Sequence, residues 1–354
     1  MNLKHFSIWS LALLLTVLTI SCTKEEGDED VSTYNKGLFI TNEGPFQTGT
    51  GTITFYDEST GTVTHDIFNL ANDRELGNVV QSMAIYNDKA YIIVNNASKI
   101  EVVDAGDFTS VTTITGLSQP RYMQVINDKK AYVSDWAGVV QILNLESNLV
   151  TGTIPAGTGP ENMLKAGDYV YVLNGGGFSI DSTLTIINSS TDQVVKTLEV
   201  FNRPTGIVQD LAGNIWVMCS GKGFNGWPSA DDTEGHLLRI NPSSQEIDLD
   251  IEFDVTSLHP EKLVINKAGN TLYFLFDNGI YKYNTTLSLS APVKVCNHAN
   301  LYSLAYDSGK DYVMATDPVD YQSNGWLYRY NAASGALVDS IQTGVIPGNV
   351  VVKE

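Results

Sequence analysis

Residues 89–104 read KAYIIVNNASKIEVVD, and this stretch decides the fold. It begins with an apolar run, Ala90 to Val94, and after a short turn a second run alternates and ends in Val103-Asp104. Two such runs separated by turn residues predict a pair of antiparallel strands. The same ending, an apolar or aromatic residue followed by Asp or Asn, recurs along the chain. The seven instances are Tyr56-Asp57, Val103-Asp104, Leu143-Asn144, Ile187-Asn188, Ile240-Asn241, Tyr283-Asn284 and Tyr330-Asn331.

The spacing of these seven strand ends indicates the architecture. Successive instances lie 47, 40, 44, 53, 43 and 47 residues apart. Each period holds a strand after Gly or Pro, an apolar strand, the strand ending in Asp or Asn, and a shorter fourth strand, as in the blade of a β-propeller. The Asp or Asn side chain can cap its own turn by a bond to the backbone. We therefore expect an all-β, seven-bladed β-propeller of four-stranded blades, with six or eight blades as alternatives.

The two ends of the repeat predict how the ring closes. The chain enters at Gly37-Leu38-Phe39-Ile40, which resembles a second strand, and leaves at residues 348–352, which resemble a first strand. Pairing these segments completes one blade and leaves no open sheet edge. The predicted propeller therefore spans residues 37–354, closed by a C-terminal strand that joins the N-terminal blade.

Composition and charge restrict the classes of function. The 354 residues include 21 basic and 40 acidic side chains, a net charge of −19. This excludes a general nucleic-acid binder, which needs a basic face against phosphate. Apolar residues make up 43% of the chain, enough to build a core. Three cysteines are too few for a disulfide scaffold.

The N-terminus has the pattern of an export signal. Lys4 and His5 precede an apolar run over residues 8–20, which ends at Ser21-Cys22. This pattern predicts a lipoprotein signal peptide over residues 1–21. Residues 18–22 resemble a lipobox, so we expect Cys22 to be the lipidated residue. The alternative is an ordinary secretory cleavage with an incidental cysteine.

An acidic segment follows Cys22. Residues 23–30 read TKEEGDED and contain five acids and one lysine, which cannot form a core. We expect a lipidated acidic tether over residues 22–36. The segment also resembles the Lys-plus-acids signal that sends lipoproteins to the outer face of the outer membrane, although a simple hydrated spacer is the alternative. The expected location is therefore the outer membrane, lipid-anchored and exposed at the cell surface, with the membrane contacted through the lipid alone.

Four segments carry a family resemblance. They are GLFITNEG (37–44), LGNVVQSM (76–83), KAYIIVNN (89–96) and KIEVVD (99–104), all in the first two predicted blades. In these segments the chain resembles the YncE-like β-propeller lipoproteins of Bacteroidetes surfaces. The functional precedent in that group is the BtuG type, which captures vitamin B12 and passes it to a TonB-dependent transporter. The resemblance implies a corrinoid, cobalamin, as bound ligand and such a transporter as partner; a siderophore remains an alternative cargo.

Loops on one rim of the propeller are the expected binding site. The second-to-third strand loops are enlarged at 42–51, 174–182, 219–235 and 316–325, and they carry aromatic residues. Flat rings with amide and guanidinium donors suit a large, amide-rich ligand. For any single aromatic residue, packing between blades is the alternative. The predicted ligand-binding residues are Phe46, Arg74, Asn96, Arg121, Trp136, Asn162, Phe178, Arg203, Phe224, Trp227, His259, His298, Tyr302, Tyr321 and Trp326.

Metal and disulfide chemistry have weaker signals. His259 or His298 could ligate cobalt, although a lone loop histidine is more often a hydrogen-bonding residue. Residues 229–235 contain three acids but lack the ligand spacing of an EF-hand, so we expect a solvated loop and no metal site. Cys219 and Cys296 lie in different repeats, and their pairing is left open.

Catalytic motifs are missing from the sequence. We find no Gly-x-Ser-x-Gly elbow and no His-Glu-x-x-His zinc motif. The sequence therefore predicts a binding protein that is not an enzyme and has no resident cofactor. Two alternatives stay open: a propeller lyase or lactonase whose base is assembled from distant loops, and an adhesin that binds glycan or protein.

Overall fold

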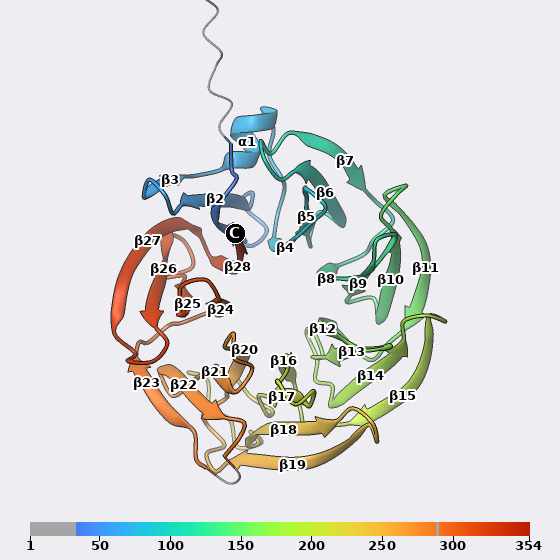
Figure 1. Cartoon of the computed structure of the whole chain (residues 1–354), viewed down its shortest axis with the longest axis vertical. Coiled ribbons are helices and arrows are strands. Elements are labelled where there is room, and N and C mark those ends of the chain that lie inside the picture. Colours follow the sequence, from blue (N-terminus) through green and yellow to red (C-terminus); the bar gives the residue numbers. More distant parts are fainter. Residues whose placement is uncertain (1–32, 288–289) are drawn as a thin grey trace, which may run out of the picture. The chain divides into compact units, whose positions relative to one another are not determined.

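The computed structural model describes residues 33–287 and 290–354. The predicted signal peptide, the lipidation site Cys22 and most of the acidic tether lie outside the described residues. Residues 33–354 form one compact unit in which seven four-stranded antiparallel sheets surround a common centre (Figure 1). The prediction of an all-β propeller with seven blades is confirmed.

Each blade runs from an inner strand beside the centre to an outer strand at the edge (Figure 1). Blades 1 to 4 are, in that order, β28 (Pro347–Lys353), β1 (Gly37–Asn42), β2 (Thr52–Asp57) and β3 (Thr62–Thr64); β4 (Val80–Tyr86), β5 (Lys89–Val94), β6 (Lys99–Asp104) and β7 (Ser110–Ile114); β8 (Pro120–Asn127), β9 (Lys130–Asp135), β10 (Val139–Asn144) and β11 (Leu149–Pro155); and β12 (Pro160–Ala166), β13 (Tyr169–Asn174), β14 (Thr183–Asn188) and β15 (Gln193–Glu199). Blades 5 to 7 are β16 (Pro204–Gln209), β17 (Ile215–Cys219), β18 (Gly235–Asn241) and β19 (Glu246–Phe253); β20 (Glu261–Ile265), β21 (Thr271–Phe276), β22 (Gly279–Asn284) and β23 (Val293–Asn297); and β24 (Ser303–Asp307), β25 (Tyr312–Asp317), β26 (Asn324–Asn331) and β27 (Leu337–Val345). A short helix, α1 (Ile67–Asn72), links blades 1 and 2.

The third strand of every blade ends at the Asp or Asn that marked it in the sequence. These side chains cap the turn that follows. In blade 3, for example, Asn144 Oδ1 accepts hydrogen bonds from the backbone N–H groups of Glu146 (2.9 Å) and Ser147 (2.8 Å). The repeat was therefore visible in the sequence because each outer hairpin needs the same local chemistry.

The two ends of the propeller meet in blade 1. Strand β28 pairs antiparallel with β1, placing Val350 opposite Ile40 and Val352 opposite Leu38. The predicted closure by a C-terminal strand is confirmed. The first blade therefore takes its inner strand from the C-terminal end of the propeller and its other three strands from the N-terminal end, which closes the ring.

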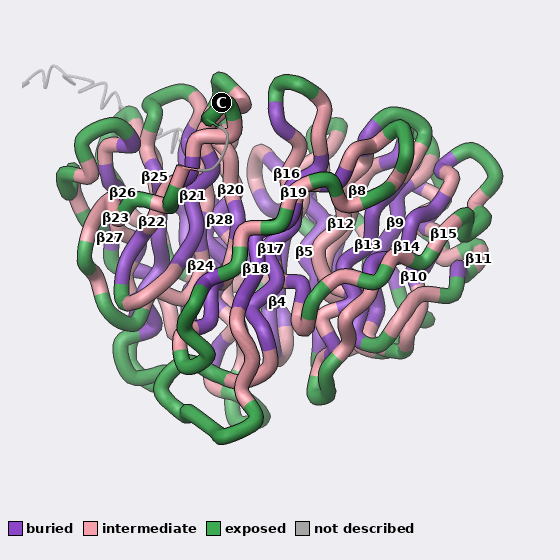
Figure 2. The backbone as a smooth tube through the Cα atoms, turned by 90° about the horizontal axis from the view of Figure 1, so that it is seen from below, coloured by how far each residue is buried: buried purple, intermediate pink, exposed green. Residues whose placement is uncertain are grey.

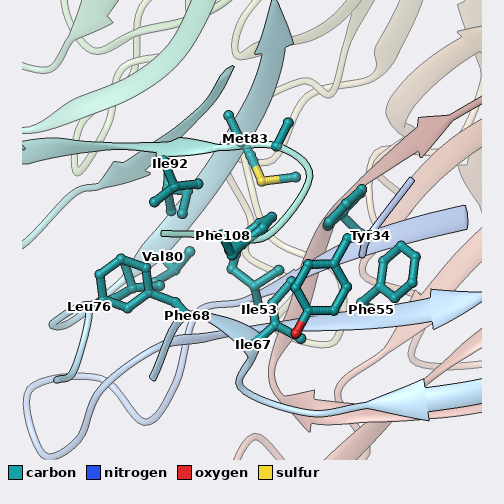
Figure 3. Close-up of a cluster of buried hydrophobic side chains, with 14 of the residues drawn as sticks. Tyr34, Ile53, Phe55, Ile67, Phe68, Leu76, Val80, Met83, Ile92 and Phe108 are labelled. Atoms are coloured by element: carbon teal, nitrogen blue, oxygen red, sulfur yellow. The ribbon is translucent and has the colours of Figure 1, made fainter. Parts of the chain in front are cut away.

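Apolar side chains from neighbouring sheets form the cores between blades, while the loops at both ends of the strands are exposed (Figure 2). The core between blades 1 and 2 also takes in Tyr34 (Figure 3). Tyr34 is 4% exposed and packs edge-on against Phe55 and Phe108, with ring centroids 5.0 and 5.6 Å apart. The tether was predicted to extend to residue 36, so its last residues are instead part of the folded unit.

Replacing Phe108 by Ala is expected to destabilise the propeller by about 3–5 kcal/mol, the usual cost of emptying a buried aromatic site. The Phe108 ring is fully buried and stacks on Phe39 at 5.4 Å. Urea unfolding checks this, with Val111→Ala as the control because Val111 lies nearby on β7 and is 51% exposed. Equal shifts of the midpoint in both variants would contradict this packing.

The structure also answers two questions about the described residues, namely the state of the cysteines and the presence of a helix that could span a membrane. Cys219 and Cys296 are free thiols, the first buried in β17 and the second half-buried in β23. Within residues 33–287 and 290–354, no helix has the length and apolar character needed to cross a bilayer.

Candidate functional site

The inner strands are irregular at their first residues. Six of the seven depart from regular pairing there, which is the mark of a β-bulge. A bulge takes residues out of the ladder and re-aims their side chains. Proline suits such a position because it cannot donate a ladder hydrogen bond. Proline begins β8, β12, β16 and β28 and directly precedes β20.

The bulged residues line one pocket of about 430 Å³, here called the mouth pocket. All seven blades contribute to it, with the inner strands around the centre of the ring (Figure 1). The lining includes Glu43, Gln81, Arg121, Tyr122, Trp136, Glu161, Asn162, Thr205, Arg203, Glu261, Lys262, Tyr302, Ser303 and Asn349. Three carboxyl groups and three cationic groups therefore face one small cavity of a strongly acidic protein.

Arg121 and Glu161 form the most extensively bonded pair in the mouth pocket. Their ion pair spans 3.1 Å, and both side chains are less than one-fifth exposed. The indole of Trp136 donates to Glu161 Oε1 at 2.8 Å, and the Arg121 guanidinium lies 4.1 Å from the centre of the indole. Arg121 also donates to the side-chain oxygen of Gln81. This side of the mouth pocket is thus held in place before any ligand arrives.

Glu43 comes from the loop between β1 and β2 and faces blade 7. The hydroxyl of Tyr302 donates to Glu43 Oε1 at 2.9 Å. Burial raises the pKa of the Glu43 carboxyl above its usual value, against the opposing effects of this hydrogen bond and of the Arg121 charge. Burial, followed by the nearby Glu43 charge, likewise raises the pKa of Tyr302. This pair can hold or release a proton inside the mouth pocket.

Arg203 connects the mouth pocket to the long loop over residues 220–234. Its guanidinium donates to the carbonyl oxygen of Gly223 and lies 4.3 Å from the ring centre of Phe224. The loop is fixed by Asn225, whose side chain exchanges two hydrogen bonds of 2.9 Å with the backbone of His259. Burial lowers the pKa of Arg203, and the Glu261 carboxylate, at 3.9 Å, opposes that shift.

The structure brings eight of the fifteen predicted residues together. Five line the mouth pocket: Arg121, Trp136, Asn162, Arg203 and Tyr302. Three more touch these: Phe178 on Trp136, Phe224 on Arg203 and Tyr321 on Tyr302. Phe178 is 84% exposed, so its ring extends the apolar rim outward from the cavity.

Seven predicted residues lie outside the lining: Phe46, Arg74, Asn96, Trp227, His259, His298 and Trp326. Arg74 binds Glu101 in blade 2, and Asn96 donates to Asn78 at 3.0 Å. Phe46 and Trp227 are exposed on loop tips, and Trp326 belongs to β26.

Both candidate histidines are engaged by the protein. The His259 ring is 1% exposed, and its Nδ1 donates to the carbonyl oxygen of Ser220 at 2.9 Å. His298 Nδ1 bonds the hydroxyl of Tyr330, and its Nε2 lies 3.4 Å from Asp317. The Nε2 atom of His259 has no hydrogen-bond partner in the described chain, but it is buried and lies outside the lining of the mouth pocket.

The acidic loop also has protein partners. Lys222 donates to Asp231, and the backbone of Ser229 donates to Asp232 at 2.8 Å. Within the part of the chain that the structure describes, no three His, Cys, Asp or Glu side chains are grouped to hold a metal ion.

Sequence reasoning missed five polar residues of the mouth pocket: Glu43 on the loop after β1, and Gln81, Glu161, Glu261 and Lys262 on inner strands. A signal for most of them was present. Glu161 directly follows a proline that opens an inner strand, and Glu261 and Lys262 follow Pro260. Gln81 occupies the equivalent position after Val80. If the residues that follow these prolines are assigned to the wall of the central cavity, Glu161, Glu261 and Lys262 can be predicted from the sequence.

The fold and the mouth pocket define a seven-bladed β-propeller protein with one polar cavity built from its inner strands. A family model matches residues 36–345, and the chain belongs to that family, DUF5074, described as a domain of unknown function. No curated protein matches the chain.

Solved structures similar to this chain share its fold at low identity. A quinonprotein alcohol dehydrogenase-like protein from Bacteroides thetaiotaomicron has a TM-score of 0.67 and 16% identity, covering 91% of this chain and 79% of that one. A putative 6-phosphogluconolactonase from Bacteroides uniformis has a TM-score of 0.66 and 12% identity, covering 90% and 99%. The periplasmic gluconolactonase of Pseudomonas aeruginosa has a TM-score of 0.65 and 10% identity, covering 89% and 98%.

These comparisons correct one prediction. The chain was expected not to be an enzyme because it lacks familiar catalytic motifs. Two of the similar structures are named as gluconolactonases, so the absence of those motifs does not show that a protein of this architecture is no enzyme. At 10–12% identity the likeness itself extends to the fold alone.

Proposed function

We propose that the mouth pocket captures a bulky, polar small molecule, most specifically a corrinoid such as vitamin B12, as in the YncE-like and BtuG-type lipoproteins that the sequence resembles. In this proposal the chain is lipidated at Cys22, lies on the surface of the outer membrane and delivers its ligand to a TonB-dependent transporter. The observation that carries the proposal is the ring of inner strands, six of them bulged, around one cavity that residues of all seven blades line.

The chemistry of the mouth pocket suits an amide-rich ligand. Side-chain amides such as Asn162 and Asn349 both donate and accept hydrogen bonds, as do the acetamide and propionamide groups of a corrinoid. A cavity of about 430 Å³ would take only one edge of so large a macrocycle. The exposed rings of Phe178 and Phe224 would contact the part that stays outside.

Calorimetric titration with cyanocobalamin and cobinamide tests the proposal. Trp136→Ala removes the indole that orders Arg121 and Glu161, so we expect at least a tenfold loss of affinity, as for a central aromatic contact. The control is Leu211→Ala, since Leu211 is 81% exposed in the turn between β16 and β17, outside the mouth pocket. Flat titrations with both corrinoids would rule out this ligand.

The location is tested separately in cells. Cys22→Ser should abolish incorporation of labelled palmitate and release the protein from the membrane fraction. Labelling that persists in this variant would contradict lipidation at Cys22.

A second candidate, lactone hydrolysis, is favoured by one observation: Glu43 is a half-buried carboxyl group with a raised pKa on the wall of the cavity. Such a carboxylate can accept a proton from a water molecule while the water oxygen attacks the lactone carbonyl carbon. It can then return the proton to the ring oxygen as the ring C–O bond breaks. Glu43→Gln should lower turnover of gluconolactone by about 10²–10⁴-fold. Turnover at the uncatalysed rate in the unmodified protein would remove this candidate.

A further inference from the structure

Lys262 differs from the other two cations of the mouth pocket. Arg121 is paired with Glu161, and Arg203 donates to the Gly223 carbonyl and approaches Glu261. Among the described residues, Lys262 has no ion-pair partner within 4.0 Å and no hydrogen-bond partner for its ammonium group. The centre of the Tyr302 ring lies 5.6 Å from the Nζ atom of Lys262.

The backbone holds Lys262 in this position at a cost. The residue has a φ of 57°, in the left-handed region that residues other than glycine rarely adopt. The bulge between Glu261 and Val264 takes Lys262 out of the regular ladder and onto the wall of the mouth pocket. Strained backbone that presents an unpaired ammonium group to a cavity is an arrangement suited to binding.

The adjacent blade adds a second cation beside it. Arg203 precedes β16, also has a positive φ of 54°, and lines the same cavity. Strands β16 and β20 pack against each other, since a Cβ on Gly206 would lie only 2.5 Å from the Cβ of Leu263. Ser303, in β24 of blade 7, also lines the cavity, and blade 7 adjoins blade 6 in the ring (Figure 1).

We propose that Lys262, together with Arg203 and Ser303, forms a subsite for an anionic oxygen group, a phosphate or a carboxylate, of the ligand held in the mouth pocket. This inference rests on the proposed function, namely that the mouth pocket binds a small molecule. The carboxyl groups of Glu43, Glu161 and Glu261 also act on the Lys262 charge, so an anion bound there competes with them for the ammonium group. The ammonium group remains charged, because neighbouring acidic groups raise the pKa of Lys262 although its burial lowers it.

The test measures binding of inorganic phosphate and of acetate through the fluorescence of Trp136 and through calorimetry. We expect Lys262→Met to weaken binding of the preferred anion by about tenfold or more, the scale of a hydrogen bond to a charged group. Lys262→Arg should restore part of it. The control is Lys267→Met, which removes an exposed lysine at the opposite end of β20. Equal anion affinity in Lys262→Met and the unmodified protein, or no binding of either anion, would overturn the subsite.

A stability measurement separates loss of binding from loss of folding. Lys262 makes no hydrogen bond or ion pair among the described residues, so we expect the ligand-free Lys262→Met variant to keep a single cooperative thermal transition. Loss of that transition would show that the ammonium group is needed for folding and would overturn the proposed role.

Corrinoids distinguish this inference from the proposed function. Cobalamin carries a phosphodiester and cobinamide does not, so Lys262→Met should weaken cobalamin binding more than cobinamide binding. Anion binding without corrinoid binding would leave the subsite standing and remove the corrinoid. If Lys262→Met bound both corrinoids as tightly as the unmodified protein, the corrinoid proposal would stand and the anion subsite would be removed.

Discussion

A chain that ends at Ile346 is expected to lose its cooperative thermal transition. It lacks β28, whose Val350 packs with Leu38, Met314 and Leu327 in the core between blades 7 and 1. It also lacks Lys353, whose ammonium group donates to backbone carbonyls of Tyr34 (3.0 Å) and Ala105 (2.7 Å), joining blade 1 to blade 2. These losses are expected to exceed about 5 kcal/mol, the lower end of the whole net stability of a domain.

Near-ultraviolet circular dichroism and calorimetry check this expectation. A chain lacking only Glu354 is the matched control, because that residue is exposed and lies beyond the last paired residue of β28. The control should melt like the full chain. If the chain ending at Ile346 melted at the same temperature as the control, closure of the ring would not be needed for stability.

Glu101→Ala is expected to destabilise the protein by about 3 kcal/mol, the scale for removing one partner of a buried ion pair. The Glu101 carboxylate is fully buried in blade 2 and binds Arg74 and Lys99, the latter at 3.2 Å. It also accepts hydrogen bonds from Ser110 at 2.7 Å and Thr113 at 3.1 Å. Removing it leaves all four donors without their common acceptor.

The matched control is Glu146→Ala. Glu146 also pairs with a lysine, at 3.0 Å, but both side chains are more than half exposed, so the change should stay within about 0.5 kcal/mol. Urea unfolding at pH 7 compares the two variants. A loss of similar size in both would mean that burial of the Glu101 network adds nothing.

The effect of Glu101→Ala should also depend on pH. Burial raises the pKa of Glu101, but hydrogen bonds from Arg74 and Ser110 and the charge of Lys99 outweigh it, so the pKa lies below its usual 4.5. A lowered pKa in the folded state stabilises the protein above the unfolded value and stops doing so as the pH falls through the folded value. The difference between variant and unmodified protein should therefore be full above about pH 4.5 and shrink below it.

The fold could be predicted because its signals are local. Each Asp or Asn at the end of a third strand caps a turn formed by the residues that directly follow it, as Asn188 does through the backbone of Ser190 and Thr191. Periodicity then gave the number of blades, and the unmatched strands at residues 37–40 and 348–352 gave the closure. None of these steps requires knowing which distant side chains meet.

The site was harder to predict because its contacts are distant in sequence. Arg74 resembled a free loop cation until Glu101, 27 residues later, was seen to bind it. Glu43 reaches the mouth pocket only because Tyr302, 259 residues away, lies beside it once the ring has closed. Lys262 was not singled out from the sequence, because the bulge that takes it out of the ladder is not evident from alternation alone.

The bulged inner strands have a consequence for how such proteins diversify. Each strand presents its cavity-facing residues from a separate sheet, so a substitution at Thr205 or Lys262 changes one sector of the wall and keeps the pairing of the neighbouring sheets. Selectivity for a new guest can therefore arise one sector at a time, by single substitutions that carry little thermodynamic penalty.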